Sequence, residues 1–163
     1  MTAIETKGLT KHYGRNRGIE DVSITVDEGE IYGFIGPNGA GKSTTIKTLL
    51  NFIFPSKGSA RVLGLDCVSA SERIKTQTGY VPSEVRFYED LMVRELLDYA
   101  ARFHRSGADT QEWIERFGLE AKKRIGELSS GSRKKTALAA ALQSRPKLLI
   151  LDEPTNGLDP LMR

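Results

Sequence analysis

The chain has 163 residues, and its 24 lysines and arginines against 21 aspartates and glutamates give a formal net charge of only +3. A hydrophobic share of 39% and a charged share of 28% exclude a disordered tail and are typical of a globular domain that can bury a core. The single cysteine, Cys67, excludes an internal disulfide and indicates a reducing compartment.

The first half of the chain predicts mostly strands. Strands are expected over 3–10, 19–26 and 30–35, the second because apolar and polar residues alternate along it. A helix is expected over 42–52, where apolar residues recur at helical spacing. A further strand over 59–63, a short helix over 71–77 and a strand over 79–82 complete this part.

From residue 84 the pattern becomes helical. Apolar residues recur at i, i+3, i+4 and i+7 from Val93 to Phe103, and further helices are expected around 113–117 and over 132–144. The apolar run over 147–151 then predicts a buried strand. The order of elements predicts an α/β fold in three parts. These parts are a core over 1–83, an inserted helical lobe over 84–145 and a return to the core over 146–163.

A glycine-rich loop joins the expected strand over 30–35 to the helix that follows. From Gly36 to Ser43 the sequence fits G-x-x-x-x-G-K-[ST] at every position. Glycines let consecutive backbone N–H groups turn toward phosphate oxygens, and the helix start adds its positive dipole end. Lys42 is expected to reach the β- and γ-phosphates, and Ser43 to bind Mg²⁺. The nucleotide-binding residues expected here are Gly36, Pro37, Asn38, Gly39, Ala40, Gly41, Lys42, Ser43 and Thr44.

Two acidic residues follow the strand over 147–151. A buried strand would deliver Asp152 at its carboxyl end, where α/β folds bind their ligands. Asp152 is expected to hold Mg²⁺, and Glu153 to orient or deprotonate an attacking water, which makes Glu153 and Lys42 the expected catalytic residues. Without the glycine-rich loop, the pair would be interpreted as two solvated acids at a strand end.

A serine- and glycine-rich stretch opens the helix expected over 132–144. Ser129, Ser130 and Gly131 can present N–H groups and hydroxyls to an anion, although such a stretch alone is only an N-cap. Together with the first loop, it suggests that two helix N-termini on different lobes share one nucleotide, the two lobes belonging to one chain or to different chains.

These motifs together resemble the nucleotide-binding subunits of ATP-binding cassette (ABC) transporters over essentially the whole chain. The stretch 36–44 is similar to the Walker A motif, 128–132 to the LSGGQ signature, 148–153 to Walker B and 154–159 to the D-loop. Tyr13 matches the aromatic residue that stacks on adenine in that family, its alternative being a strand-edge tyrosine.

The resemblance implies a P-loop NTPase core with a largely parallel sheet, an N-terminal antiparallel β portion and the helical lobe. It implies ATP and Mg²⁺ as cofactors, and as partners an integral-membrane permease subunit and a second nucleotide-binding subunit that shares two ATP sites. The location implied is the cytoplasmic face of a bacterial membrane. The runs Tyr32–Thr44 and Pro82-Ser83-Glu84 are most similar to ATPase subunits of ABC-2-type exporters.

Three departures from the family pattern bear on turnover. The signature has Ser130 for a glycine and Ser132 for glutamine, and Ser83 stands where a glutamine is usual. No histidine follows Walker B, because His12 and His104 both precede it. The chain is therefore expected to be a truncated piece of a longer subunit that binds ATP but hydrolyses it poorly.

Two other classes of function are weaker alternatives. One is a soluble ABC ATPase that acts on DNA or ribosomes, although the tandem cassettes and long basic arms typical of that class do not occur here. The other is a regulatory module without turnover, which the serine substitutions would allow. The basic clusters Lys122–Arg124 and Arg133–Lys135 are interpreted as solvated faces, so no nucleic-acid partner is expected.

Overall fold

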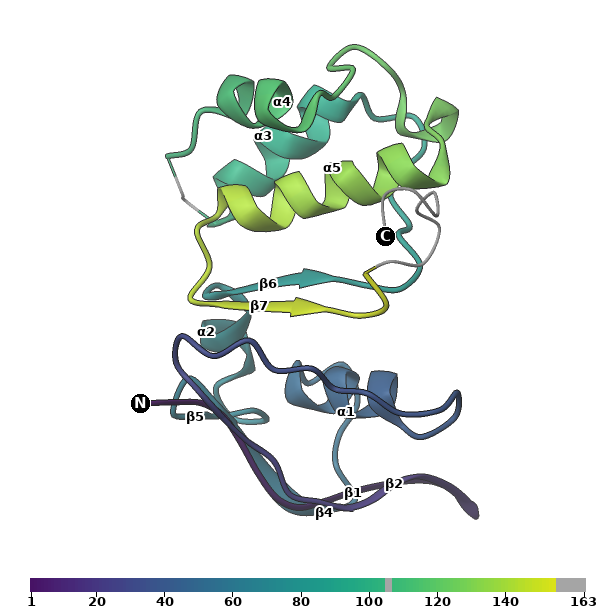
Figure 1. Cartoon of the computed structure of the whole chain (residues 1–163), viewed down its shortest axis with the longest axis vertical. Coiled ribbons are helices and arrows are strands. Elements are labelled where there is room, and N and C mark those ends of the chain that lie inside the picture. Colours follow the sequence, from purple (N-terminus) through teal and green to yellow (C-terminus); the bar gives the residue numbers. More distant parts are fainter. Residues whose placement is uncertain (105–106, 155–163) are drawn as a thin grey trace. The chain divides into compact units, whose positions relative to one another are not determined.

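The computed structural model describes residues 1–104 and 107–154, drawn as a ribbon in Figure 1. The chain divides into two compact units, 1–77 and 78–163. Each unit has its own sheet and helices and is described by itself.

The first unit is built on an antiparallel sheet around one long strand. β1 (Thr2–Tyr13) pairs with β2 (Asn16–Val22), β3 (Thr25–Asp27) and β4 (Lys57–Val62), and β4 continues into a short hairpin with β5 (Leu65–Asp66). This is the N-terminal antiparallel β portion that the family resemblance implies.

The strand expected over 19–26 is divided between β2 and β3. The hydroxyl of Thr6 on β1 accepts a hydrogen bond from the N–H of Ile24 and donates one to the carbonyl of Val22. The N–H of Thr6 also donates to the carbonyl of Ile24, so Thr6 binds the link between the two strands with its side chain and its backbone. The chain moves there from one part of β1 to another.

Two helices complete the first unit. α1 (Lys42–Leu49) packs against β2 and β4, and α2 (Ser71–Lys75) follows the β4–β5 hairpin. Leu9, Leu50, Val62 and Ile74 are buried, as the alternation of the strands and the helical spacing predict. The end of α1 falls three residues before the predicted end at residue 52, because Asn51 takes a positive φ of 51°.

The prediction of a strand over 30–35 is wrong. These residues form no strand, and none of the described strand ladders includes them. Ile31 and Ile35 are exposed, and Tyr32 and Phe34 are partly so. A strand exists only with a hydrogen-bonding neighbour, and composition alone cannot supply one.

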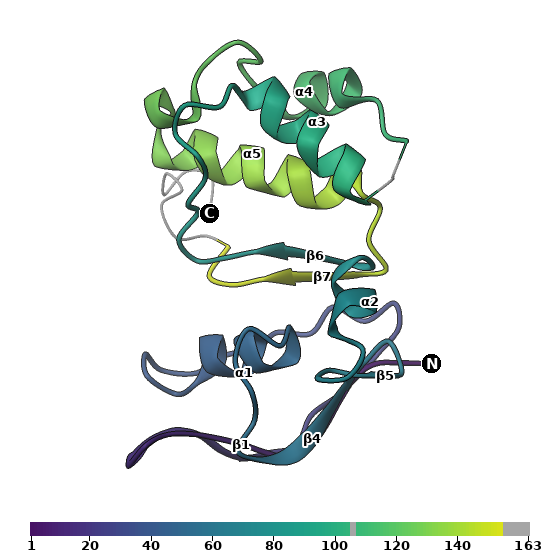
Figure 2. The same ribbon diagram turned by 180° about the vertical axis from the view of Figure 1, so that it is seen from behind.

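The second unit places three helices beside a two-stranded parallel sheet. β6 (Thr78–Val81) and β7 (Leu148–Leu151) pair in register from Thr78–Leu148 to Val81–Leu151, which is the parallel pairing among the described residues. The helices are α3 (Val93–His104), α4 (Thr110–Phe117) and α5 (Ser130–Gln143), with a 3₁₀ turn, η1, over Ile125–Glu127. Figure 2 shows from behind that α5 lies between the sheet and the other two helices.

The apolar stripes found in the sequence are the core of this unit. Val93, Leu96 and Leu97 of α3 pack with Ile114 of α4 and with Leu128. On its other side, α5 packs Ala137 and Ala141 against Val81 of β6. None of the helices in the described residues has the length and apolar character needed to cross a bilayer.

Candidate functional site

The glycine-rich loop turns through two glycines of positive φ before α1 begins. Gly39 and Gly41 have φ of 82° and 93°, a conformation that glycine adopts without steric cost. Gly41 is the N-cap of α1 and provides no side-chain cap for the first helical turn. The start of α1 therefore presents its positive dipole end without a side-chain cap, and the binding of phosphate there stays a prediction.

Close packing fixes the loop against β2 of the same unit. A Cβ atom at Gly41 would lie 2.3 Å from Cγ2 of Ile19 and 2.8 Å from the carbonyl oxygen of Gly18. Only glycine fits there, so the second glycine of the motif is required by packing as well as by φ.

Lys42, the first residue of α1, lies over the loop. Its Nζ donates to the carbonyl oxygens of Gly36 at 2.7 Å and Pro37 at 3.0 Å. Ser43 and Thr44 follow in the first helical turn and are half-buried. The structure thus brings the expected Walker A residues together in one loop of the first unit.

Tyr13 also lies in the first unit, at the end of β1. Its ring is 47% exposed, and the ammonium of Lys11 lies 5.4 Å from the ring centroid. The ring is therefore accessible for stacking, as its expected role requires.

The serine-rich stretch caps α5 in the second unit. Ser129 is the N-cap, and its Oγ accepts a hydrogen bond from the N–H of Ser132 at 3.2 Å. The helix begins at Ser130, two residues before the predicted start, because the cap lies earlier. Ser130 and Gly131 are thus in the first turn of the helix, at its positive dipole end.

Asp152 and Glu153 leave the carboxyl end of β7, as expected. The N–H of Asp152 extends the sheet by donating to the carbonyl of Val81 at 2.9 Å, and Asp152 is only 4% exposed. Burial, and then the Asp152 charge, raise the pKa of Tyr80. Glu153 is exposed and has a φ of 48°, which is uncommon for a residue with a side chain.

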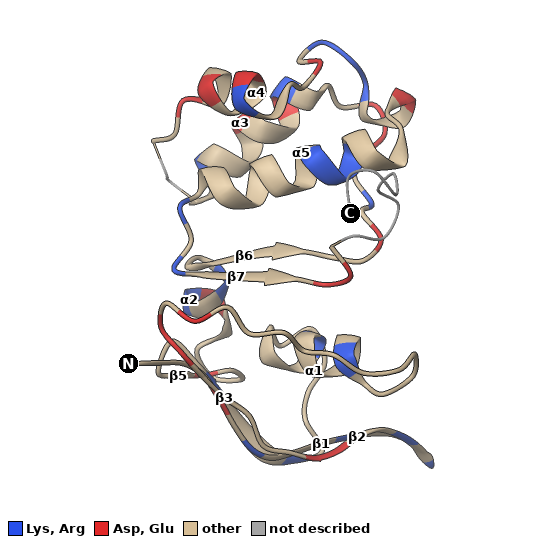
Figure 3. Cartoon of the chain, in the orientation of Figure 1, with Lys and Arg blue, Asp and Glu red and all other residues tan. Residues whose placement is uncertain are grey.

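Lys134 of α5 is a site residue that the sequence analysis missed. Figure 3 shows the band of basic residues on the first half of α5. The prediction that Arg133, Lys134 and Lys135 form a solvated face is wrong for Lys134, which is 3% exposed. The signal was available, because Lys134 precedes the buried residues Ala137 and Ala141 by three and seven positions, on the same helix face.

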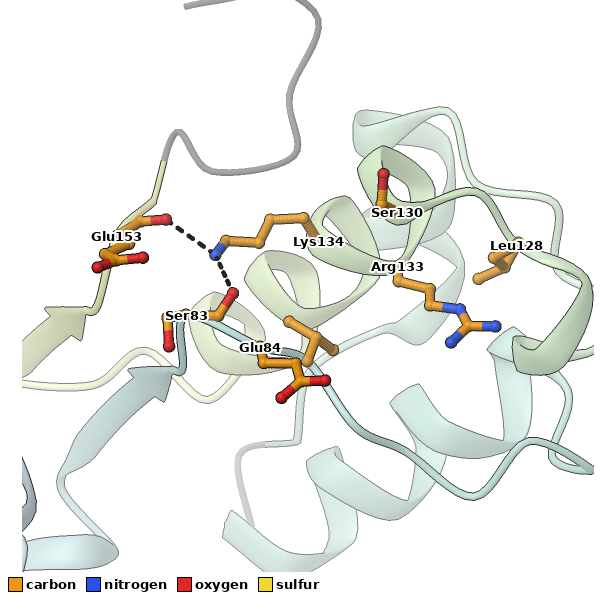
Figure 4. A pocket seen from close by; sticks show the side chains of 8 residues that line it. Ser83, Glu84, Leu128, Ser130, Arg133, Lys134 and Glu153 are labelled. Carbon is orange, nitrogen blue, oxygen red and sulfur yellow. Dashed lines mark hydrogen bonds between the residues drawn. The ribbon is translucent and has the colours of Figure 1, made fainter. Parts of the chain in front are cut away.

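The ammonium of Lys134 is bound by three backbone carbonyls. Its Nζ donates to the carbonyl oxygens of Pro82 at 3.2 Å, Ser83 at 3.3 Å and Glu153 at 3.1 Å. Figure 4 marks the contacts with Ser83 and Glu153. Burial lowers the pKa of Lys134, and the negative charges of Asp152 and Glu153 partly offset that effect.

A pocket of about 650 Å³ lies beside this lysine within the second unit (Figure 4). Its lining residues are Ser83, Glu84, Val85, Leu128, Ser130, Arg133, Lys134 and Glu153. It therefore brings the serine-rich stretch together with Glu153 and with the loop after β6. The Walker A loop belongs to the first unit, and D-loop residues 155–159 lie outside the described residues.

Comparison with known proteins identifies the family. A family described as "ABC transporter" matches residues 19–156, which is most of the chain. The chain belongs to the ABC transporter family. Its resemblance to ATP-binding subunits of that family is thereby confirmed.

Relatives and a solved structure agree with this membership of the ABC transporter family. The chain is 41% identical to the bacitracin transport ATP-binding protein BcrA of Bacillus licheniformis, over 98% of this chain and 54% of BcrA. It is 38% identical to the Nod factor export ATP-binding protein I of Rhizobium sp. strain N33, over 99% of this chain and 55% of that protein. The chain thus spans about half the length of these relatives.

The structural comparison shows the P-loop NTPase fold of ABC ATPases. A solved structure entitled "Structure of ATP binding subunit of ABC transporter" matches with a TM-score of 0.87 and 34% identity, over 98% of this chain and 70% of that one. The α/β fold class expected from the sequence is therefore confirmed.

Proposed function

We propose that this chain is the ATP-binding and ATP-hydrolysing part of an ABC transporter subunit. The observation that carries the proposal is the loop 36–44, where two positive-φ glycines, Lys42 and the uncapped start of α1 converge. These are the backbone donors and the cation that a nucleotide's phosphates require.

The residue roles follow from chemistry. Lys42 binds the β- and γ-phosphates, and Glu153 orients or deprotonates the attacking water. Ser43 and Asp152 would hold Mg²⁺ in this proposal, since a hydroxyl and a carboxylate are the hard oxygen ligands that this ion prefers. When bound, Mg²⁺ neutralises phosphate charge.

A second subunit completes the ATP site in this proposal. Ser129, Ser130 and Gly131 at the start of α5 would face the γ-phosphate held by a second copy, and Tyr13 would stack on the adenine. The position of Ser130 and Gly131 at the positive N-terminal end of α5 supports the phosphate contact, and the exposed ring of Tyr13 supports the stacking.

The partner that would use this ATP is an integral-membrane permease, with the chain peripheral on the cytoplasmic face of a bacterial membrane. The names of the relatives, in bacitracin transport and Nod factor export, support transport and favour export. We place the permease contact on Tyr88, in the segment after Ser83. Tyr88 is 83% exposed, which leaves its ring accessible to a partner.

Two finer points belong to the same proposal. Turnover by this chain is slow, because Ser83 lacks the amide of the usual glutamine and Ser130 and Ser132 alter the signature. The chain consists of a core part over 1–83, a helical lobe over 84–145 and a second core part over 146–163. The helical lobe carries the permease contact.

The test is the nucleotide affinity of Lys42→Ala in the full chain. Removing the loop's ammonium should weaken ATP binding at least tenfold, or ~1.4 kcal/mol, with the fold intact. Lys47→Ala is the matched control, because Lys47 lies exposed in the last turn of the same helix. Equal ATP affinity of the two variants and the unchanged chain would overturn the assignment of the phosphate site.

A further inference from the structure

Lys134 connects one helix to the two loops that leave the parallel sheet. Pro82 and Ser83 follow β6, and Glu153 comes two residues after β7. Because β6 and β7 are parallel, both segments leave the same end of the sheet. The three N–H donors of one ammonium match the three carbonyls, so all of them are used.

The contact with Glu153 falls where the backbone needs support. Glu153 has a φ of 48°, a strained conformation for a residue with a side chain, which persists only when its surroundings fix it. The hydrogen bond from the ammonium of Lys134 to the carbonyl of Glu153 is such a constraint. Because the side chain of Lys134 is already buried, making this hydrogen bond restricts it little further.

Lys134 also lies one helical turn from the start of α5. Ser130 and Lys134 are four residues apart, so their side chains share a helix face, and both line the pocket of Figure 4. A shift of the first turn of α5 would therefore move the ammonium and, through it, the main chain at Ser83 and Glu153.

We infer that Lys134 is a positioning residue for ATP hydrolysis, which holds the backbone of Ser83 and Glu153 in register with the start of α5. The inference rests on the proposed function, since it takes Glu153 as the residue that orients water. It acts through main-chain carbonyls, so it depends on a donor at position 134 and not on the side chain of Ser83. A misplacement of about 1 Å at a reacting group commonly costs 10²-fold in rate.

The experiment compares Lys134→Met, Lys134→Arg and Lys135→Met with the unchanged full chain. Methionine keeps the length of the side chain and removes the donors, arginine keeps donors and charge, and Lys135→Met removes the same charge one residue later. The measurements are ATP affinity, kcat for phosphate release, and amide hydrogen exchange in peptides spanning 82–85, 95–103 and 151–154.

Lys134→Met should lower kcat at least about tenfold, while ATP affinity stays within about twofold, because Lys42 and its loop are unaltered. Exchange should rise in the peptides spanning 82–85 and 151–154 and stay constant over 95–103 in α3. Lys134→Arg should recover most of the lost turnover, and Lys135→Met should match the unchanged chain.

The outcomes separate the inference from the proposed function. If the unchanged chain hydrolyses ATP and Lys134→Met retains its kcat or its exchange in both loop peptides, the inference is overturned and the function stands. If the unchanged chain neither binds nor hydrolyses ATP, the proposed function fails, and the positioning role fails with it. Should Lys134→Met unfold, exchange rises over 95–103 as well, and Lys134→Gln, which keeps a donor, takes its place.

Discussion

At the scale of single residues, Cys67 combines burial with an unfavourable setting for a thiolate. The residue is 1% exposed, and burial, followed by the nearby charge of Asp66, raises the pKa of its thiol. We expect iodoacetamide at pH 8 to alkylate the folded chain at least about 100-fold more slowly than the chain in denaturant. Mass spectrometry of quenched samples measures both rates. Similar rates would show that the thiol is accessible in the folded state.

The raised pKa of the same thiol makes the free energy of unfolding depend on pH, with the folded state favoured at lower pH. Because the pKa of the thiol is higher in the folded state than in the unfolded state, the thiol of the folded chain stays protonated to a higher pH. This contribution is complete below the ordinary thiol pKa of about 8.5 and is lost as pH rises through the folded value.

Residue patterns predicted the glycine-rich loop before α1 better than they predicted the burial of Lys134. The spacing from Gly36 to Ser43 is local, so the loop and the start of α1 follow from consecutive residues. The three carbonyls around Lys134 come from positions 52, 51 and 19 residues away in the sequence. Helical periodicity placed the residue on the buried face, but only the fold could show what it binds.

At the scale of elements, β1 and β4 meet at two glycines. A Cβ atom at Gly58 would lie 2.2 Å from the carbonyl oxygen of Gly8, and Gly58 has a φ of 77°. Gly58→Ala should cost about 2–4 kcal/mol, from an unfavourable φ plus the displacement of β1. Gly14→Ala is the matched control, since Gly14 also has a positive φ but nothing within 4 Å, and it should cost only about 1 kcal/mol.

Urea unfolding measures the free energy of unfolding of the Gly58→Ala and Gly14→Ala variants. Equal losses for the two glycine variants would show that β1 and β4 do not approach so closely.

The helices were predictable because their apolar spacing is strong and local. α3 begins at Val93 as the pattern indicates and extends one residue past Phe103, and its stripe is buried. Strands depended on partners that periodicity does not reveal. The hydroxyl of Thr6 divides the stretch 19–26, and no described ladder pairs residues 30–35.

At the scale of the whole molecule, two neighbouring aromatic residues have different expected roles, one in binding the permease and one in the stability of the fold. Tyr88 is exposed, whereas Phe87 packs against both apolar clusters of the second unit. Tyr88→Ala should leave the melting temperature within about 1 °C and weaken co-purification with the permease. Phe87→Ala should lower the melting temperature by several degrees, since it removes a packed aromatic ring. Undiminished co-purification of Tyr88→Ala would place the contact elsewhere.

The burial of Cys67 makes the chain suitable for labelling without further engineering. A cysteine introduced on the surface would be the single thiol within reach of a maleimide dye, because Cys67 is 1% exposed and no other cysteine occurs in the sequence. Tyr88→Cys would therefore carry one fluorophore at a defined position, with the native core left intact. Its emission could report movement of the segment after Ser83 when nucleotide is added.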